Sequence, residues 1–488
     1  MKRKADELEK DNNWEESDEH DDDNDNGDDA DEVDSPSTKK LQIDDGLFII
    51  EEKVFFGSEE QQLEGMKELL PFFNGNDIRP VCITIQLLGR LEESSSGITQ
   101  RENIANFVLE LIPLLSFNQL ENILKFVLIT SLQSMFRCPR LRDQAFSILT
   151  ALVEHSSSIK TLVLEESDLG KAMTRIYLDC WQDDLSVATK LSSLLPQLLC
   201  KYTEKPPIDL VRPWMPLILL LLKSDLDEDH LVRCYGLCSL IASREDSIWP
   251  FLSLGYLPVL LQALKEKASS APIMTRVLKI LATLTAGTDE QMGLAVDSDL
   301  LSRVVPLLRH EHPKVNGRAC WLISNVMASS QELIQMVIDL HLLEFFMEEL
   351  RAGRSSAPFR EKAIHCLLNV SQQGSQEQIE FVLSLGILEL LAPMLAPDSG
   401  ESHEMVLFVV ESLYDIARSL RQVSVAAMDD YYDLLIDAGI EDHIEYFSLL
   451  HPNHGILQTS QILLSFLQQD EELGDFENDP PRRCITEG

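Results

Sequence analysis

The chain has 488 residues, with 81 Asp and Glu against 41 Lys and Arg, and a formal net charge of −40 at pH 7. An acidic excess of this size disfavours nucleic acid as a partner and favours basic partners. No run of about 18 apolar residues and no apolar leader segment is present, so the sequence predicts neither a membrane span nor a secretion signal.

The first 43 residues are predicted to form a disordered acidic tail. Residues 1–40 contain 17 Asp or Glu and 6 Lys or Arg, a composition that buries too little apolar surface to fold. Short basic clusters at Lys2-Arg3-Lys4 and Lys39-Lys40 flank the acidic run, and they are either nuclear-targeting signals or solubilising ends. A second acidic tail is predicted for residues 469–488.

Residues 44–468 show helical periodicity almost throughout. Apolar side chains recur at spacings of three and four, and this pattern indicates an all-α fold without a domain break. The first predicted helices are Ile49–Leu70, Pro80–Leu91, Asn106–Leu115, Gln119–Met135 and Leu141–Val153.

A repeated turn that opens an apolar helix sets a period. Its central positions are 255, 299, 341, 386 and 439, which are 44, 42, 45 and 53 residues apart. A period of about 40–47 residues is typical of armadillo or HEAT repeats. The sequence therefore predicts an armadillo-repeat, right-handed superhelical solenoid of about nine or ten units over residues 44–468.

Trp321 and Asn325 are four residues apart, so a helix places them on one face. An indole walls a slot for a cationic side chain, and an amide hydrogen-bonds to an extended backbone. This pair is a candidate peptide-binding site. The alternative is a half-buried Trp that closes a helix stack.

Motifs for catalysis are not found in the sequence. It has no phosphate-binding Gly-rich loop, no nucleophile elbow and no pair of histidines at HExxH spacing. The nine cysteines show no paired metal-ligand spacing and fit the reducing cytosol or nucleus. We expect a binding protein that is not an enzyme and that needs no cofactor or metal.

Several longer motifs follow one another in the second half of the chain. They are Gly287-Thr288-Asp289-Glu290-Gln291, Ala319–Val326, Asn369 followed by Gln376-Glu377-Gln378-Ile379, and Gly439–Glu445. In this order they resemble importin-α, the adaptor that carries proteins with nuclear localisation signals, and the resemblance is clearest from about Pro206 to Phe476.

In that family, Trp/Asn pairs along an inner groove bind Lys/Arg-rich peptides at a major site in early repeats and a minor site in late repeats. The resemblance implies an intact pair in the seventh repeat, an Asn with His in place of Trp in the eighth, and a Thr with a nearby acid in the sixth. The implied peptide-binding residues are Trp321, Asn325, Asn369, His365, Thr283 and Asp289.

Departures from the family pattern weaken the expected binding of a basic peptide. In the register that the resemblance suggests, the third and fourth repeats have lost the pair, and Tyr235 replaces the Trp of the fifth. Arg318 and Lys362 stand where the family has acids, and each repels a basic peptide by roughly 1 kcal/mol when partly exposed. The third-repeat and fourth-repeat positions hold Ser147, Ala151 and His155, and Ser193 and Gln197.

The predicted function is that of an importin-α-like adaptor of nucleus and cytoplasm, with basic segments of cargo proteins as partners. The family's Arg/Lys-rich segment for importin-β is replaced here by the acidic run, which favours loss of importin-β binding over a reduced form of it. An importin-α export receptor is a further implied partner. The alternative is a non-transporting armadillo scaffold, a chaperone or regulator of basic nuclear proteins.

Overall fold

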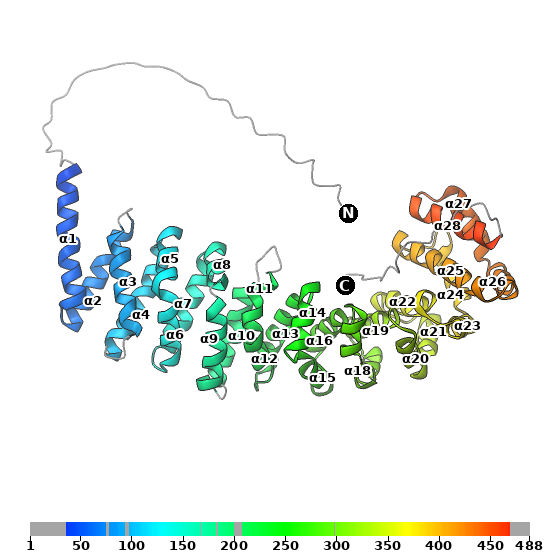
Figure 1. Ribbon diagram of the computed structural model, residues 1–488, viewed down its shortest axis with the longest axis horizontal. Coiled ribbons are helices and arrows are strands. Elements are labelled where there is room, and N and C mark those ends of the chain that lie inside the picture. Colours follow the sequence, from blue (N-terminus) through cyan, green and yellow to red (C-terminus); the bar gives the residue numbers. More distant parts are fainter. Residues whose placement is uncertain are drawn as a thin grey trace, which may run out of the picture. The chain divides into compact units, whose positions relative to one another are not determined.

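The computed structural model describes residues 36–74, 78–92, 97–165, 167–181, 184–199, 207–296 and 298–468. Every regular element in these ranges is a helix (Figure 1). Both predicted tails, up to residue 35 and from 469 onward, lie outside the described residues. The predicted N-terminal boundary was wrong, because helix α1 (Pro36–Phe56) already includes residues 36–43. Proline suits the first turn of a helix, where its missing N–H has no partner to lose.

The chain divides into two compact units, one up to Leu69 and one from Leu70. In the first unit, α1 packs on α2 (Glu59–Leu69), and Lys53 Nζ lies 2.8 Å from Glu68 Oε1. The predicted single helix Ile49–Leu70 is therefore two helices. The break falls at Gly57, where a Cβ would lie 2.5 Å from the Lys53 carbonyl oxygen, so only glycine fits.

The second unit is a succession of short helices, most of which fall into groups of three. Their bounds are α3 (Arg79–Glu92), α4 (Ile98–Leu111), α5 (Phe117–Ile123), α6 (Ile129–Arg137), α7 (Arg142–His155), α8 (Ser157–Glu165), α9 (Ser167–Ile176), α10 (Leu185–Leu199), α11 (Ile208–Val211), α12 (Met215–Leu222), α13 (Glu228–Ala242), α14 (Ile248–Ser253), α15 (Tyr256–Glu266), α16 (Ala271–Leu284), α17 (Asp289–Ala295), α18 (Ser298–Val304), α19 (Pro313–Met327), α20 (Gln331–Asp339), α21 (Leu342–Ala352), α22 (Ala357–Gln373), α23 (Gln376–Ser384), α24 (Ile387–Leu391), α25 (His403–Val423), α26 (Val425–Asp437), α27 (Ile440–Leu450) and α28 (His454–Leu467).

The long third helix of each group packs on the third helix of the next. We call α4, α7, α10, α13, α16, α19, α22, α25 and α28 the inner row. In Figure 1, α19, α22 and α25 lie on the inner side of the bend in this unit, while α18, α20 and α21 lie outside. Three-helix repeats of about 43 residues that stack only on their neighbours are the armadillo form of a solenoid.

The turns that set the sequence period are confirmed as a structural repeat. Gly255, Gly386 and Gly439 have φ angles of 81°, 76° and 72°, and each directly precedes α15, α24 or α27. His341 takes the same left-handed conformation, with φ of 55°, before α21. The predicted period therefore follows a backbone turn that occurs once in each of these repeats.

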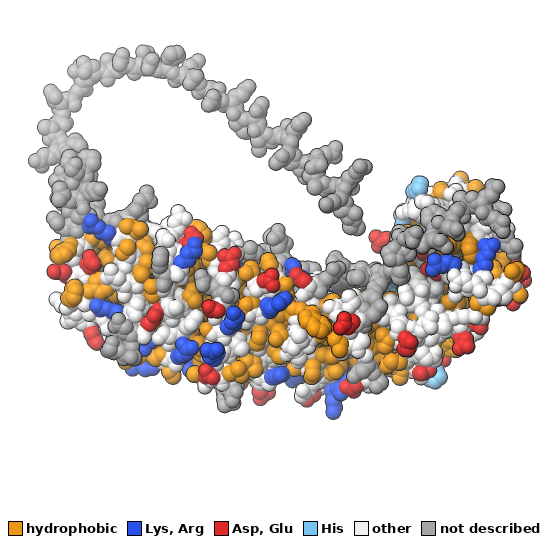
Figure 2. Space-filling model, in the orientation of Figure 1, with side chains coloured by type: hydrophobic (Ala, Val, Ile, Leu, Met, Phe, Trp, Pro, Cys, Tyr) orange, Lys and Arg blue, Asp and Glu red, His pale blue; other side chains and the backbone are white. Residues whose placement is uncertain are grey.

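Large apolar side chains fill the space between the rows of helices. Trp181 and Trp214 are fully buried in the early repeats, as are Phe346 and Phe447 in the late ones. Figure 2 shows basic and acidic side chains interspersed with apolar ones on the visible face of the second unit. Within the described ranges, no single helix has the length and apolarity to cross a membrane. Gln376–Ser384 and Ile387–Leu395 reach that length and apolarity only together, as a pair bent by 64°.

Candidate functional site

The N-cap residues fix a common register along the inner row. The Asp227, Ser270 and Ser402 side chains accept hydrogen bonds from the first turns of α13, α16 and α25, and His312 does the same for α19. Positions nine and thirteen residues after each N-cap share one face of a helix. In α16, α19 and α22 these positions hold Lys279 and Thr283, Trp321 and Asn325, and His365 and Asn369.

The structure thus brings five of the six predicted site residues onto one face of three consecutive inner helices. Asp289 is not among them, because it begins α17, which lies outside the inner row. Its side chain lies outside the described part of the structure. Thr283 is half-buried, and its Oγ1 donates to the Lys279 carbonyl oxygen of its own helix at 3.0 Å.

Both asparagines bind the preceding inner helix. Asn325 Nδ2 donates to the Ala282 carbonyl oxygen at 2.7 Å, and Asn369 Nδ2 donates to that of Ser324 at 2.8 Å. Ala282 and Ser324 lie in the last turns of α16 and α19, and their carbonyl oxygens accept these bonds in addition to local ones from Thr285 Oγ1 and the Ala328 N–H. Each amide therefore stabilises the stacking of the inner row, and retains its oxygen and a second N–H for a ligand.

The Trp321 ring is covered by a cation of the chain itself. The Arg318 guanidinium carbon lies 5.4 Å from the ring centroid, within the range of a cation–π contact. Burial lowers the pKa of Arg318 from its ordinary value. The indole is 7% exposed. A cationic ligand group could bind over this ring only if it displaced Arg318.

His365 supplies a neutral aromatic surface in the next repeat. Its ring stacks on Phe408 of α25, with centroids 4.4 Å apart and an interplanar angle of 29°. Burial lowers the pKa of His365 to about 4, helped by the charge of Lys362 and opposed by that of Glu361. The imidazole is therefore uncharged at neutral pH.

A cavity of about 650 Å³ opens between α7 and α10 at the early end of the row. These two helices pack less closely than the inner pairs that follow them. Short side chains line much of the cavity, together with the larger Phe146, Lys190 and Leu194. Its lining includes Ser147, Thr150, Ala151, Glu154, Ser193 and Gln197.

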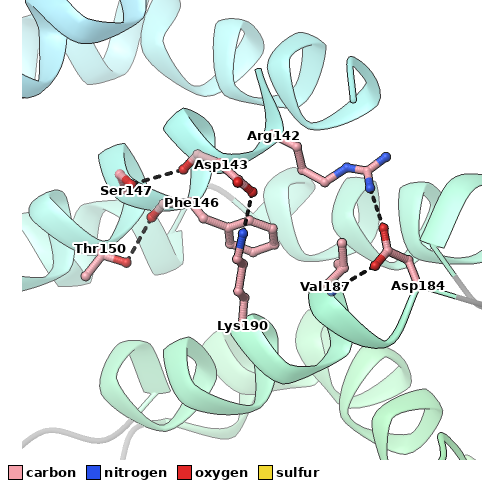
Figure 3. Close-up of polar contacts among 8 residues, drawn as sticks. All are labelled: Arg142, Asp143, Phe146, Ser147, Thr150, Asp184, Val187 and Lys190. Atoms are coloured by element: carbon pink, nitrogen blue, oxygen red, sulfur yellow. Dashed lines mark hydrogen bonds and ion pairs between the residues drawn. The ribbon is translucent and has the colours of Figure 1, made fainter. Parts of the chain in front are cut away.

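Figure 3 shows how charged residues bridge the two helices at this cavity. Lys190 of α10 forms an ion pair with Asp143 of α7, and its ammonium lies 5.8 Å from the centroid of the Phe146 ring. At the edge, Arg142 Nη1 donates to Asp184 Oδ2 at 2.6 Å.

The N-cap count changes the register that the resemblance suggested for two repeats. Counted from Leu141, which precedes α7, the equivalent residues are Thr150 and Glu154, so an acid is present where the sequence suggested none. His155 instead lies against the Leu115 carbonyl oxygen, with Nε2 at 3.1 Å. In α13 the position holds Gly236, while Tyr235 is buried in the core.

The sequence reasoning missed two carboxylates at the late end of the row. Counted from Ser402, α25 carries Glu411 and Asp415 at the same two positions. Burial raises the pKa of Asp415 to about 6, opposed by the charge of Arg418 and helped by that of Glu411. Arg418 Nη2 lies 3.7 Å from Asp415 Oδ1. The N-cap at Ser402 is the signal that would have revealed this pair.

The site offers polar and aromatic contacts and no metal-binding cluster. Among the described residues, no group of three or more His, Cys, Asp or Glu side chains has the arrangement that a metal ion needs. The arrangement suits the binding of an extended chain along successive helices.

Comparison with known proteins agrees with this architecture. No family model matches the chain. Importin subunit alpha-8 of Arabidopsis thaliana is 28% identical over 257 residues, covering 52% of this chain and 56% of the relative. Importin subunit alpha-3 of the same plant is 26% identical over 289 residues, covering 58% and 53%. The chain thus spans about half the length of these curated relatives.

Among solved structures, the crystal structure of an engineered protein matches 87% of this chain and 99% of its own, with a TM-score of 0.59 and 15% identity. This match concerns the fold alone. Together with the three-helix repeats, the comparisons describe an armadillo-type solenoid whose sequence is similar to importin-α subunits.

Proposed function

We propose that this chain is a peptide-binding adaptor of the importin-α type, and that the inner row holds an extended segment of a client protein. The observation that carries the proposal is the repeated register, in which the same positions of successive inner helices face one way. An extended chain presents backbone polar groups at regular intervals, so a row of repeated side chains can bind it without a deep pocket.

The contact residues that we propose are those of the late repeats. Asn325 and Asn369 would bind the client backbone through the amide atoms left free by their bonds within the chain. The client side chains would lie against Trp321, His365 and Thr283, next to these two amides. We retain Asp289 only as a flanking residue, since α17 is outside the inner row.

The finer proposal is that the client is a nuclear cargo protein with a basic localisation signal, carried between cytoplasm and nucleus. It is supported by the similarity to importin-α subunits. A basic signal at this site would be repelled by Arg318, which lies over the Trp321 ring. This repulsion favours a second candidate function, that of a scaffold that does not transport. Carboxylates that could attract a basic segment lie towards the two ends of the row, on Glu154, Glu411 and Asp415.

The test is binding of labelled 13-residue peptides that are basic, neutral or acidic, followed by fluorescence polarisation at physiological salt. We expect at least one peptide to bind the full chain, and we expect a Trp321→Ala/Asn325→Ala variant to lose this binding. The matched control is Trp249→Ala, which removes an indole that is 54% exposed on α14, outside the inner row. The proposed adaptor function would be overturned if none of the three peptides bound, or if the double variant bound them as wild type does.

A further inference from the structure

A basic residue stands at the same place in five consecutive inner helices. Six residues after each N-cap lie Lys190, Arg233, Arg276, Arg318 and Lys362, which are 43, 43, 42 and 44 residues apart. This position is about one turn before the Trp321 position and on the same face of the helix. We call these five residues the basic stripe.

The two end members of the basic stripe are paired with acids. Lys190 pairs with Asp143, and Lys362 Nζ lies 2.8 Å from Glu361 Oε1. These pairs leave the ends of the stripe nearly neutral.

The three central members have no carboxylate within ion-pair distance among the described residues. Arg233 Nη1 donates to Ser193 Oγ at 2.7 Å, and Arg276 Nη1 donates to the Pro272 carbonyl oxygen at 2.8 Å. Arg276 also fills the space beside Gly236, where a Cβ would lie 3.3 Å from its Nε. Arg318 has the Trp321 ring. Their neighbours are therefore neutral, and three charges remain uncompensated.

The same face also lacks acids at the next two positions along each helix. From α10 to α22, the sites nine and thirteen residues after the N-cap hold no Asp or Glu, and one of them holds Lys279. Acids return only on the flanking helices, with Glu154 on α7 and Glu411 and Asp415 on α25. On a chain with a net charge of −40, the inner face from α10 to α22 thus carries unpaired charges that are positive.

We propose that the basic stripe binds an extended Asp- and Glu-rich segment of a client protein. This inference rests on the proposed function and names the class of client for the same groove. Arg276 and Arg318 are half-buried, and a half-buried guanidinium without an anion gives up hydration that a client carboxylate replaces. At physiological salt, charges more than about 8 Å apart are largely screened from each other. The electrostatic potential at the groove is therefore set by the basic stripe and not by the distant acidic surface.

The repeat geometry sets the spacing of acids in that segment. Packed helices lie about 8–10 Å apart, and an extended chain advances about 3.3 Å per residue. One carboxylate about every third residue therefore matches one cation per repeat. A segment of about 13 residues reaches across the five helices.

The experiment uses the full chain and three labelled 13-residue peptides with Glu, Gln or Lys at every third residue of one common sequence. The variant is Arg233→Gln/Arg276→Gln/Arg318→Gln. The control is Arg140→Gln/Lys171→Gln/Arg212→Gln, which removes three cations that are 63%, 67% and 59% exposed outside the basic stripe. Both variants change the net charge equally, and circular dichroism melting checks that both fold.

We expect the Glu peptide to bind most tightly, and the stripe variant to raise its Kd about tenfold or more while the control leaves it within about twofold. Equal effects of the two variants would overturn the inference, since binding would then follow net charge. Binding of the Lys peptide alone would overturn it while leaving the adaptor intact. If none of the peptides binds, the adaptor itself is rejected and the inference falls with it.

Discussion

His365 is held neutral by its surroundings, and this links the stability of the late repeats to pH. Its pKa in the folded chain is about 4, whereas an unperturbed histidine titrates near 6.5. Between these values the unfolded chain binds a proton that the folded chain does not. Stability that depends on the neutral imidazole is therefore complete above about pH 6.5 and is lost as the pH falls towards 4.

Replacing His365 by Phe should remove this pH dependence while keeping the ring that stacks on Phe408. We expect wild type to lose about 3 kcal/mol relative to His365→Phe between pH 7 and pH 4. The raised pKa of Asp415 acts in the opposite direction over pH 4–6, so the difference between the proteins is the quantity to measure. Thermal unfolding across this range provides it.

His341→Asn is the control for this measurement, because the His341 side chain is 83% exposed and asparagine tolerates its left-handed backbone. This variant should follow wild type. Parallel curves for wild type and His365→Phe would contradict the argument.

The spacing of residues within one helix was enough to predict which candidates share a face. Trp321 and Asn325 are four apart, and the structure places them together on α19. Their partners were not predictable, because the contact of Arg318 with the Trp321 ring depends on side-chain conformation, and Asn325 bonds to a carbonyl 43 residues earlier. Contacts between repeats depend on how the helices stack, which a local pattern does not contain.

Helices α19 and α22 form the most closely packed pair of the inner row. Gly317 permits this approach, since a Cβ there would lie 2.9 Å from the Pro358 Cβ of α22. The proline ring is fixed by its own backbone and has little freedom to move away. The close stacking at the centre of the candidate site thus depends on one glycine.

Gly317→Ala should destabilise the second unit by about 1–3 kcal/mol, because overpacking outweighs the helix propensity gained from alanine. Urea unfolding followed by circular dichroism measures the change. Gly293→Ala in α17 is the matched control, since a Cβ there meets nothing within 4 Å. The control should be neutral or stabilising by up to about 1 kcal/mol. If both variants behaved alike, Gly317 would have no part in the stacking.

Element boundaries followed from the sequence where capping chemistry was visible. The glycine turns before α15, α24 and α27 lie at the predicted positions. The Thr288 capping box with Gln291 likewise marks the start of α17. The registers of the third and fifth repeats were misplaced, because α7 and α13 lack a Trp/Asn pair to align and only the N-cap shows where each helix begins.

At the scale of the molecule, the sequence contained the repeat period and the distribution of charge, but not how the charges group in space. A net charge of −40 favoured basic partners. The basic stripe becomes visible only when residues about 43 apart are stacked in register, so the proposed acidic client follows from the fold and not from the composition. We therefore expect the register of the repeats to affect binding more than the total charge does.

The acidic N-terminal segment bears on transport by the whole chain. Residues 18–34 contain 11 Asp or Glu and no Lys or Arg, and a segment of this charge is unsuited to an acidic carrier surface. We expect purified chain and importin-β to elute separately in size-exclusion chromatography at micromolar concentration. The control is a chimera in which residues 1–35 are replaced by the Lys/Arg-rich importin-β-binding segment of an importin-α subunit, and it should co-elute. Co-elution of the unmodified chain would favour a transport adaptor over a scaffold that acts without the carrier.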